Sequence, residues 1–268
     1  MNNIKSKKLH FILLMICSFL FSVHLRAQIT GQMTIEKMRF NILKLDKGID
    51  STKGKIKNIR DAQFLPDLYL ALAELYVTKS KFMYALKIAE NKDAPVEELD
   101  FTFEKRLKVN AIETYDLLVD KFPNFKGRDK AIFFKAHEQR ELGLLNEMVI
   151  TYNTLTKEYP NSPFWAESQI VIGNYYFEDK KNVDFAKEIY SKILKKPLSA
   201  FTPLAHYKIG WCNINHGKFK RAFKSFEKVL LQFKKVNLTE LPENLRKTDV
   251  RQDALLAMIW PYSELSEN

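Results

Sequence analysis

Small and aromatic side chains recur along this chain at an interval of about 37 residues. Each small residue lies in one helix-like segment and is followed by an aromatic residue in the next segment. The pairs are Ala136 with Tyr152, Gly173 with Tyr190, and Gly210 with Phe226. A period of this size is typical of stacked helix pairs, because each pair exposes an apolar face that only its neighbours cover. The recurrence therefore predicts an array of helical hairpins.

The composition supports an all-α fold. The 268 residues include only 8 Gly and 9 Pro, which leaves few tight turns and favours helices over a many-stranded sheet. Hydrophobic residues make up 46% of the chain and charged residues 28%, as in a sequence that folds around an apolar core.

The stretch from Ile150 to Phe233 resembles the tetratricopeptide repeat (TPR), in which small residues let two helices cross closely and a Tyr or Phe fills the gap. In the last unit the matching residues are Gly210, Gly217, Ala222 and Phe226. In the unit before it they are Gly173, Tyr176, Ala186, Tyr190 and Pro197, with one extra residue in the turn. The resemblance implies an all-α TPR-type solenoid over residues 63–236.

Two further units are expected in this array. The first is indicated by small and apolar residues at Leu72, Ala73, Tyr76, Ala85 and Ala89, which we interpret as a helix pair. The unit around Ala136 departs from the TPR pattern, with Lys135 and Met148 at positions where other residues are usual. Residues 237–268 are expected to form a loop and then either a capping helix or the start of a further repeat.

Residues 1–27 have the pattern of a secretory signal peptide. A basic head with Lys5, Lys7 and Lys8 precedes an apolar run from Phe11 to Ser22, which is too short to span a bilayer. We expect export and cleavage near Ala27, which would leave Cys212 as the only cysteine.

Residues 28–62 carry a heptad-like apolar seam and are expected to form a long amphipathic or coiled-coil helix. The seam consists of Ile35, Met38, Ile42, Leu45, Ile49, Thr52, Ile56 and Ile59. It would either pack on the following domain or pair with a second copy to form a homo-oligomer.

Longer phrases of the sequence, such as EMVITYNTLTKEYPNSPF, resemble a narrower group. These are exported TPR proteins of Gram-negative envelopes, linked to gliding motility, outer-membrane assembly or Tol–Pal function. The resemblance implies a protein or peptide partner in the cell envelope, and a periplasmic or peripheral outer-membrane location. The basic residues behind the net charge of +11 are interspersed with acids, so acidic proteins or anionic envelope polymers are better partners than nucleic acid.

Sequence patterns of catalysis are incomplete. The pair His137-Glu138 begins a zinc-protease motif, but Glu141 stands where the second His is needed. Cys212, His216 and His206 share a predicted helix without the usual spacing of zinc ligands. Gly-rich phosphate loops and Gly-x-Ser-x-Gly elbows are absent. We expect a protein that is not an enzyme and that binds no metal or cofactor.

The resemblance implies a concave groove lined by the first helix of each unit. The residues carried onto the groove are Phe133, His137, Arg140, Ile170, Asn174, Phe177, Tyr207, Trp211 and Ile214. Aromatic residues together with Arg and Asn are typical of protein-recognition surfaces. The function expected is a scaffold that grips a partner polypeptide, with Trp211 as the leading contact. Alternatively, several of these residues pack between repeats, and the protein is an oligomerising spacer.

Overall fold

The computed structural model describes residues 34–59, 63–233 and 249–266, and the expected signal peptide lies outside them. The chain forms two compact units, Met1–Phe122 and Pro123–Asn268. Throughout the described residues the regular structure is helical, without strands, as the composition predicted. No helix in these ranges is both long enough and apolar enough to cross a membrane.

The first unit contains α2 (Ile35–Asn58), α3 (Leu65–Glu90), the short helix η1 (Val96–Glu98) and α4 (Thr102–Lys121). The helix α3 packs against both α2 and α4. Every position of the heptad-like seam on α2 is at least half-buried, and Met38 and Ile49 are fully buried. Ion pairs from Asp46 to Lys79 and from Arg39 to Glu90 also link α2 to α3.

The helix pair expected between Leu72 and Ala89 is wrong, because α3 runs unbroken from Leu65 to Glu90. The stretch between Tyr76 and Ala85 contains none of the strongest turn formers, Gly, Pro, Asn or Asp, and its one Ser, Ser80, donates a hydrogen bond to the Glu104 carbonyl of α4. The partner of α3 is α4 instead, to which Lys87 is joined by an ion pair with the buried Glu104 (3.2 Å).

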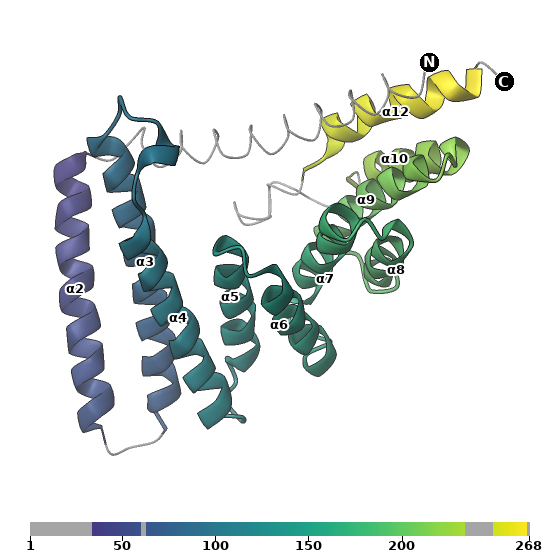
Figure 1. Ribbon diagram of the computed structural model, residues 1–268. Helices are drawn as coiled ribbons and strands as arrows, with labels where there is room; N and C mark the ends of the chain where they lie inside the picture. The colour runs from purple at the N-terminus through teal and green to yellow at the C-terminus, as the bar shows by residue number, and fades with distance from the viewer. Residues whose placement is uncertain (1–33, 60–62, 234–248, 267–268) are drawn as a thin grey trace. The chain divides into compact units, whose positions relative to one another are not determined.

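The second unit is a stack of helical hairpins (Figure 1). Its helices are α5 (Arg128–Glu141), α6 (Leu145–Glu158), α7 (Trp165–Asn174), α8 (Val183–Ile193), α9 (Phe201–Asn215), α10 (Phe219–Phe233) and α12 (Arg251–Ser266). Each helix from α5 to α10 packs against the next, and α12 packs on α10. This is the TPR-type arrangement that the recurrence predicted.

Two of the hairpins turn at a glycine with positive φ. Gly143 (φ 76°) and Gly217 (φ 64°) follow α5 and α9. The amide of the residue after each glycine donates to a carbonyl five residues back, from Leu144 to Gln139 and from Lys218 to Asn213. This is the Schellman pattern, which needs a left-handed residue and therefore favours glycine.

The third hairpin turns differently, through a π-helical turn, η2 (Tyr175–Asp179), at the end of α7. The Lys180 amide donates to the Tyr175 carbonyl, five residues back (3.1 Å), and the left-handed residue that follows is Lys181 (φ 53°). A π-turn accommodates one additional residue per turn of helix. The extra residue seen in the sequence of this unit is therefore absorbed here.

Candidate functional site

Eight of the nine residues predicted to line a groove lie on α5, α7 and α9, the first helices of successive hairpins, and the ninth, Phe177, lies in η2 directly after α7. Three of them are buried instead of presented to a partner: Phe133, Ile170 and Ile214, each 5% exposed. The ring of Phe133 stacks on Phe164 at the entry to α7, with ring centroids 4.6 Å apart. These three residues therefore pack between repeats and do not line a groove, which is the alternative that the sequence left open.

Tyr207 and Trp211 are half-buried and belong to an aromatic group on α9 and α10. Both rings contact Phe226, with centroids 5.8 Å and 6.0 Å away. They pack on a core cluster that includes Val250 and Ala254 from the start of α12. Trp211 therefore helps to hold α12 in place, and only part of its ring is left for a partner.

His137 and Arg140 remain accessible on α5. The side chain of Arg140 is 41% exposed and that of His137 is 29% exposed. His137 Nδ1 lies 3.2 Å from Oε1 of the buried Glu138. Both side chains act on Glu167 of α7: burial raises the pKa of that carboxyl, and His137 and Arg140 oppose the shift. A cluster of mixed charge thus connects α5 to α7.

Asn174 and Phe177 are half-buried at the end of α7. The Tyr190 hydroxyl donates a hydrogen bond to Asn174 Oδ1 (2.8 Å), which fixes the orientation of the amide. Phe177 packs against the core cluster shared by α7, α8 and α9. Next to it, Glu178 forms an ion pair with Lys208 of α9 (3.7 Å).

Sequence reasoning missed Glu167, Glu178 and Lys208. These residues connect the first helices of neighbouring hairpins by charge, and the predicted groove contained only one ionised side chain, Arg140. Their signal in the sequence is weak, because isolated charges on a helix usually face solvent. The accessible part of this face is more polar than the nine predicted residues suggest.

Cys212 and His206 are buried on α9, where they lack the properties of a catalytic pair. Burial raises the pKa of the Cys212 thiol to about 12, so the nucleophilic thiolate is not formed near neutral pH. Burial, with a smaller effect of Lys228, lowers the pKa of His206 to about 4. His216 Nε2 lies 3.1 Å from the exposed Asp184. In the part of the chain that the structure describes, no three His, Cys, Asp or Glu side chains form a metal-binding group.

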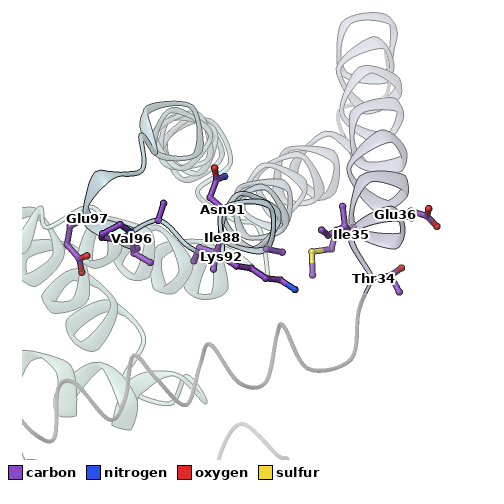
Figure 2. A pocket seen from close by; sticks show the side chains of 12 residues that line it. Thr34, Ile35, Glu36, Ile88, Asn91, Lys92, Val96 and Glu97 are labelled. Carbon is purple, nitrogen blue, oxygen red and sulfur yellow. The ribbon is translucent and has the colours of Figure 1, made fainter.

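The first unit contains an open cavity of about 930 Å³. It lies between the start of α2 and the end of α3, and the loop that leads to η1 completes it (Figure 2). Its lining is largely apolar, with Ile35, Met38, Ile88, Pro95 and Val96. Lys92 extends toward the α2 side of the cavity. The lining also includes Glu36 and Glu97, and no convergent set of polar side chains defines a ligand.

The stacked hairpins of the second unit have a helical-repeat fold of the TPR type. A family model described as "Tetratricopeptide repeat" matches residues 204–235, which cover most of the α9–α10 hairpin. A comparison with curated protein sequences found no match.

Solved structures of helical-repeat proteins resemble the chain in fold. BtubC (BKLC) from P. vanneervenii matches with a TM-score of 0.53 and 13% identity, over 87% of this chain and 88% of that one. The apo form of RapI matches with a TM-score of 0.51 and 14% identity, over 90% and 72%. TPR-like repeats of a proposed kinesin light chain from Podosopora anserina match with a TM-score of 0.50 and 13% identity, over 80% and 93%. At these identities the likeness concerns the fold alone.

Proposed function

We propose that the protein is a non-enzymatic scaffold that binds another polypeptide on the first-helix face of its second unit. The observation that carries the proposal is a polar cluster across two hairpins of a TPR-like stack, in which His137 and Arg140 are accessible and Glu167 is half-buried. Repeats of this type present rows of side chains on successive helices, a geometry that suits an extended partner.

The polar cluster supplies specificity in this proposal, and aromatic residues supply apolar contact. Arg140 presents a fork of donors that matches a carboxylate or a backbone carbonyl. The exposed parts of Phe177 and Tyr207 add apolar area on the next two hairpins. An acidic or carboxylate-bearing segment is the partner that best fits Arg140, consistent with the positive net charge of the chain.

The test compares partner capture by variants that leave the core intact. Replacement of Arg140 and His137 by Ala removes two accessible side chains and should abolish recovery of the partner seen with the wild-type protein. Lys224→Ala on α10 is the matched control, because it also removes one exposed positive charge but lies on a second helix. Equal recovery by the double variant and the wild type, both folded by circular dichroism, would reject the proposal.

We also propose that the protein is exported from the cytoplasm. The signal-peptide pattern of residues 1–27 and the resemblance to envelope TPR proteins support export to the periplasm, with peripheral association at the outer membrane. Cell fractionation and N-terminal sequencing of the mature protein test this setting. A first residue of Gln28 in the periplasmic fraction is expected, whereas an uncleaved cytoplasmic chain would contradict it.

A second role, that of an oligomerising spacer, is favoured by one observation on α2. Phe40 and Leu43 are 55% and 61% exposed, on the side of α2 away from the seam that faces α3. Light scattering of the wild type and of a Phe40→Glu/Leu43→Glu variant tests whether this side joins two copies. A monomer in both cases would remove the spacer role from residues 28–62.

A further inference from the structure

The helix α10 and the residues beside it carry most of the positive net charge that lies outside residues 1–27. Residues 218–235 contain seven Lys or Arg and a single acid, Glu227, and so account for +6 of the total of +11. Residues 1–27 contribute +4, and all the other residues together contribute +1. Acids are interspersed with the basic residues elsewhere in the chain, but not here.

Five of these basic side chains are exposed on α10 or directly before it. We refer to them as the α10 basic row, which consists of Lys218, Lys220, Arg221, Lys224 and Lys228. In the described part of the chain none of the five forms an ion pair with an acid. On α8, by contrast, Lys192 pairs with Glu188 (3.6 Å). The cations of the α10 basic row are therefore available to an anion from outside the chain.

The α10 basic row is unfavourable for the helix that carries it. Lys220, Lys224 and Lys228 follow one another at intervals of four residues, so like charges are neighbours on one face. The first turn of α10 contains no acid, although the partial positive charge of a helix N-terminus favours one. Burial lowers the pKa of Lys187 on α8, and the cations near the start of α10 lower it further. A bound anion would relieve these repulsions.

The spacing of the row fits an extended polypeptide with acidic residues. Residues four apart on a helix are separated by about 6 Å along its axis. Residues two apart on an extended strand are separated by about 6.6–6.8 Å and point to the same side. Carboxylates at alternate positions of such a strand can therefore meet Lys220, Lys224 and Lys228 in turn, because flexible lysine side chains absorb the small difference.

The surroundings of the row favour a polypeptide over a membrane or a nucleic acid. An anionic lipid surface favours basic residues spread over several helices, but the charges of α8 cancel and α12 contains two acids and one Arg. Single-stranded nucleic acids stack their bases on accessible aromatic rings. Beside the row, Phe219 and Phe223 are half-buried and lie against Trp260 and Tyr262, with ring centroids 6.4 Å and 6.5 Å apart.

We propose that the α10 basic row binds an extended acidic segment of another polypeptide. The row lies on the second helix of its hairpin, so this surface is separate from the first-helix face, and the inference does not rest on the function proposed for that face. Charge attraction supplies most of the affinity, and binding should therefore weaken as salt is added.

Fluorescence anisotropy with a labelled peptide of about twelve alternating Glu and Ser residues tests the proposal, at about 50 mM salt. The wild-type protein should bind this peptide and not its Gln-Ser analogue. Lys220→Gln/Lys224→Gln/Lys228→Gln should weaken binding roughly tenfold, because three exposed ion pairs are lost. Loss of one charge, as in Lys224→Ala, leaves four cations and should weaken binding only about twofold.

Lys53→Gln/Lys55→Gln/Lys57→Gln is the matched control, because it removes three exposed lysines from α2. It should change the affinity for the peptide less than about twofold. The triple variant of α10 should also resist urea at least as well as the wild type, since Gln has a helix propensity close to that of Lys and the like charges are gone. A loss of binding in this variant then reports on the ligand and not on the fold.

Three results would overturn the proposal. The first is a wild-type protein that does not bind the Glu-Ser peptide, or that loses it equally in the two triple variants. The second is tighter binding to phosphatidylglycerol vesicles or to oligo-dT than to the peptide, which would assign the row to a lipid or a nucleic acid. The third is a loss of peptide binding only in His137→Ala/Arg140→Ala, which would place the acidic ligand on the first-helix face.

Discussion

The ring of Phe226 lies where a side chain at Gly210 would have to be, since a Cβ built on Gly210 would come within 2.3 Å of Phe226 Cε1. The same relationship holds between Gly173 and Tyr190, also at 2.3 Å. Both aromatic rings are 0% exposed. Each of these two hairpins is therefore closed by an aromatic ring that packs directly on the backbone of the opposite helix.

Replacement of Gly210 by Ala should destabilise the protein by about 1–3 kcal/mol, because the added methyl group overlaps the Phe226 ring and forces the helices apart. The loss outweighs the gain of about 1 kcal/mol in helix propensity that Ala brings. Urea unfolding followed by circular dichroism measures the difference in the free energy of unfolding.

Gly54→Ala is the matched control for that substitution. Gly54 lies inside α2, and an added Cβ would meet no atom within 4 Å. The same chemical change should therefore stabilise the protein by about 0.5–1 kcal/mol through helix propensity. Equal changes in the free energy of unfolding for Gly54→Ala and Gly210→Ala would show that the Phe226 ring leaves room for a larger residue at position 210.

Tyr190→Phe should lower the free energy of unfolding by about 1 kcal/mol. The substitution removes the hydroxyl that donates to Asn174 Oδ1 and leaves a half-buried amide oxygen without this donor. The ring itself is preserved, so packing on Gly173 is unchanged. Tyr84→Phe, at a ring that is 40% exposed, is the comparison and should have almost no effect.

Cys212 should resist alkylation in the folded protein. Its side chain is 0% exposed, and burial raises the pKa of the thiol to about 12, so both access and thiolate are lacking near pH 8. Treatment with iodoacetamide should label Cys212 at least about 100-fold more slowly than in urea, as judged by mass spectrometry of its peptide. Rapid labelling under native conditions would place the thiol at the surface.

His206 should make stability depend on pH between about 6.5 and 4. Burial lowers its pKa in the folded state from 6.5 to about 4. As pH falls through 6.5 the unfolded chain takes up a proton that the folded protein does not, so the folded state loses stability. The loss from His206 should be about 1–2 kcal/mol between pH 7.5 and pH 5. Urea midpoints of His206→Gln, which cannot take up this proton, should show a shallower dependence than the wild type.

Much of the second unit could be predicted from the sequence because its turns and its close contacts use specific residues. Gly143 and Gly217 mark helix ends, and Gly173 and Gly210 mark the helix crossings. The first unit lacks such residues, and there the prediction of a helix pair failed at α3. The sequence between Tyr76 and Ala85 contained the necessary information, since a run without turn-forming residues favours a continuous helix.

The predicted binding face was harder to derive, since exposure depends on neighbours that a repeat register does not specify. Phe133 occupies an inward position of α5, yet Phe164 from the entry of α7 stacks on it and buries it. Trp211 is half-covered because α12 packs on the same cluster. Residue positions along a helix identify the side that a residue occupies, whereas tertiary contacts decide how much of it a partner can reach.

The π-turn at Tyr175–Asp179 lets this hairpin contain one more residue than its neighbours. One additional residue is accommodated within this single turn of backbone, and the close helix crossings at Gly173 and Gly210 are both retained. The number of residues in the turn can therefore differ between hairpins while the contacts of Tyr190 and Phe226 remain the same. A scan that assumes a constant period would lose such units, even though their helices still stack.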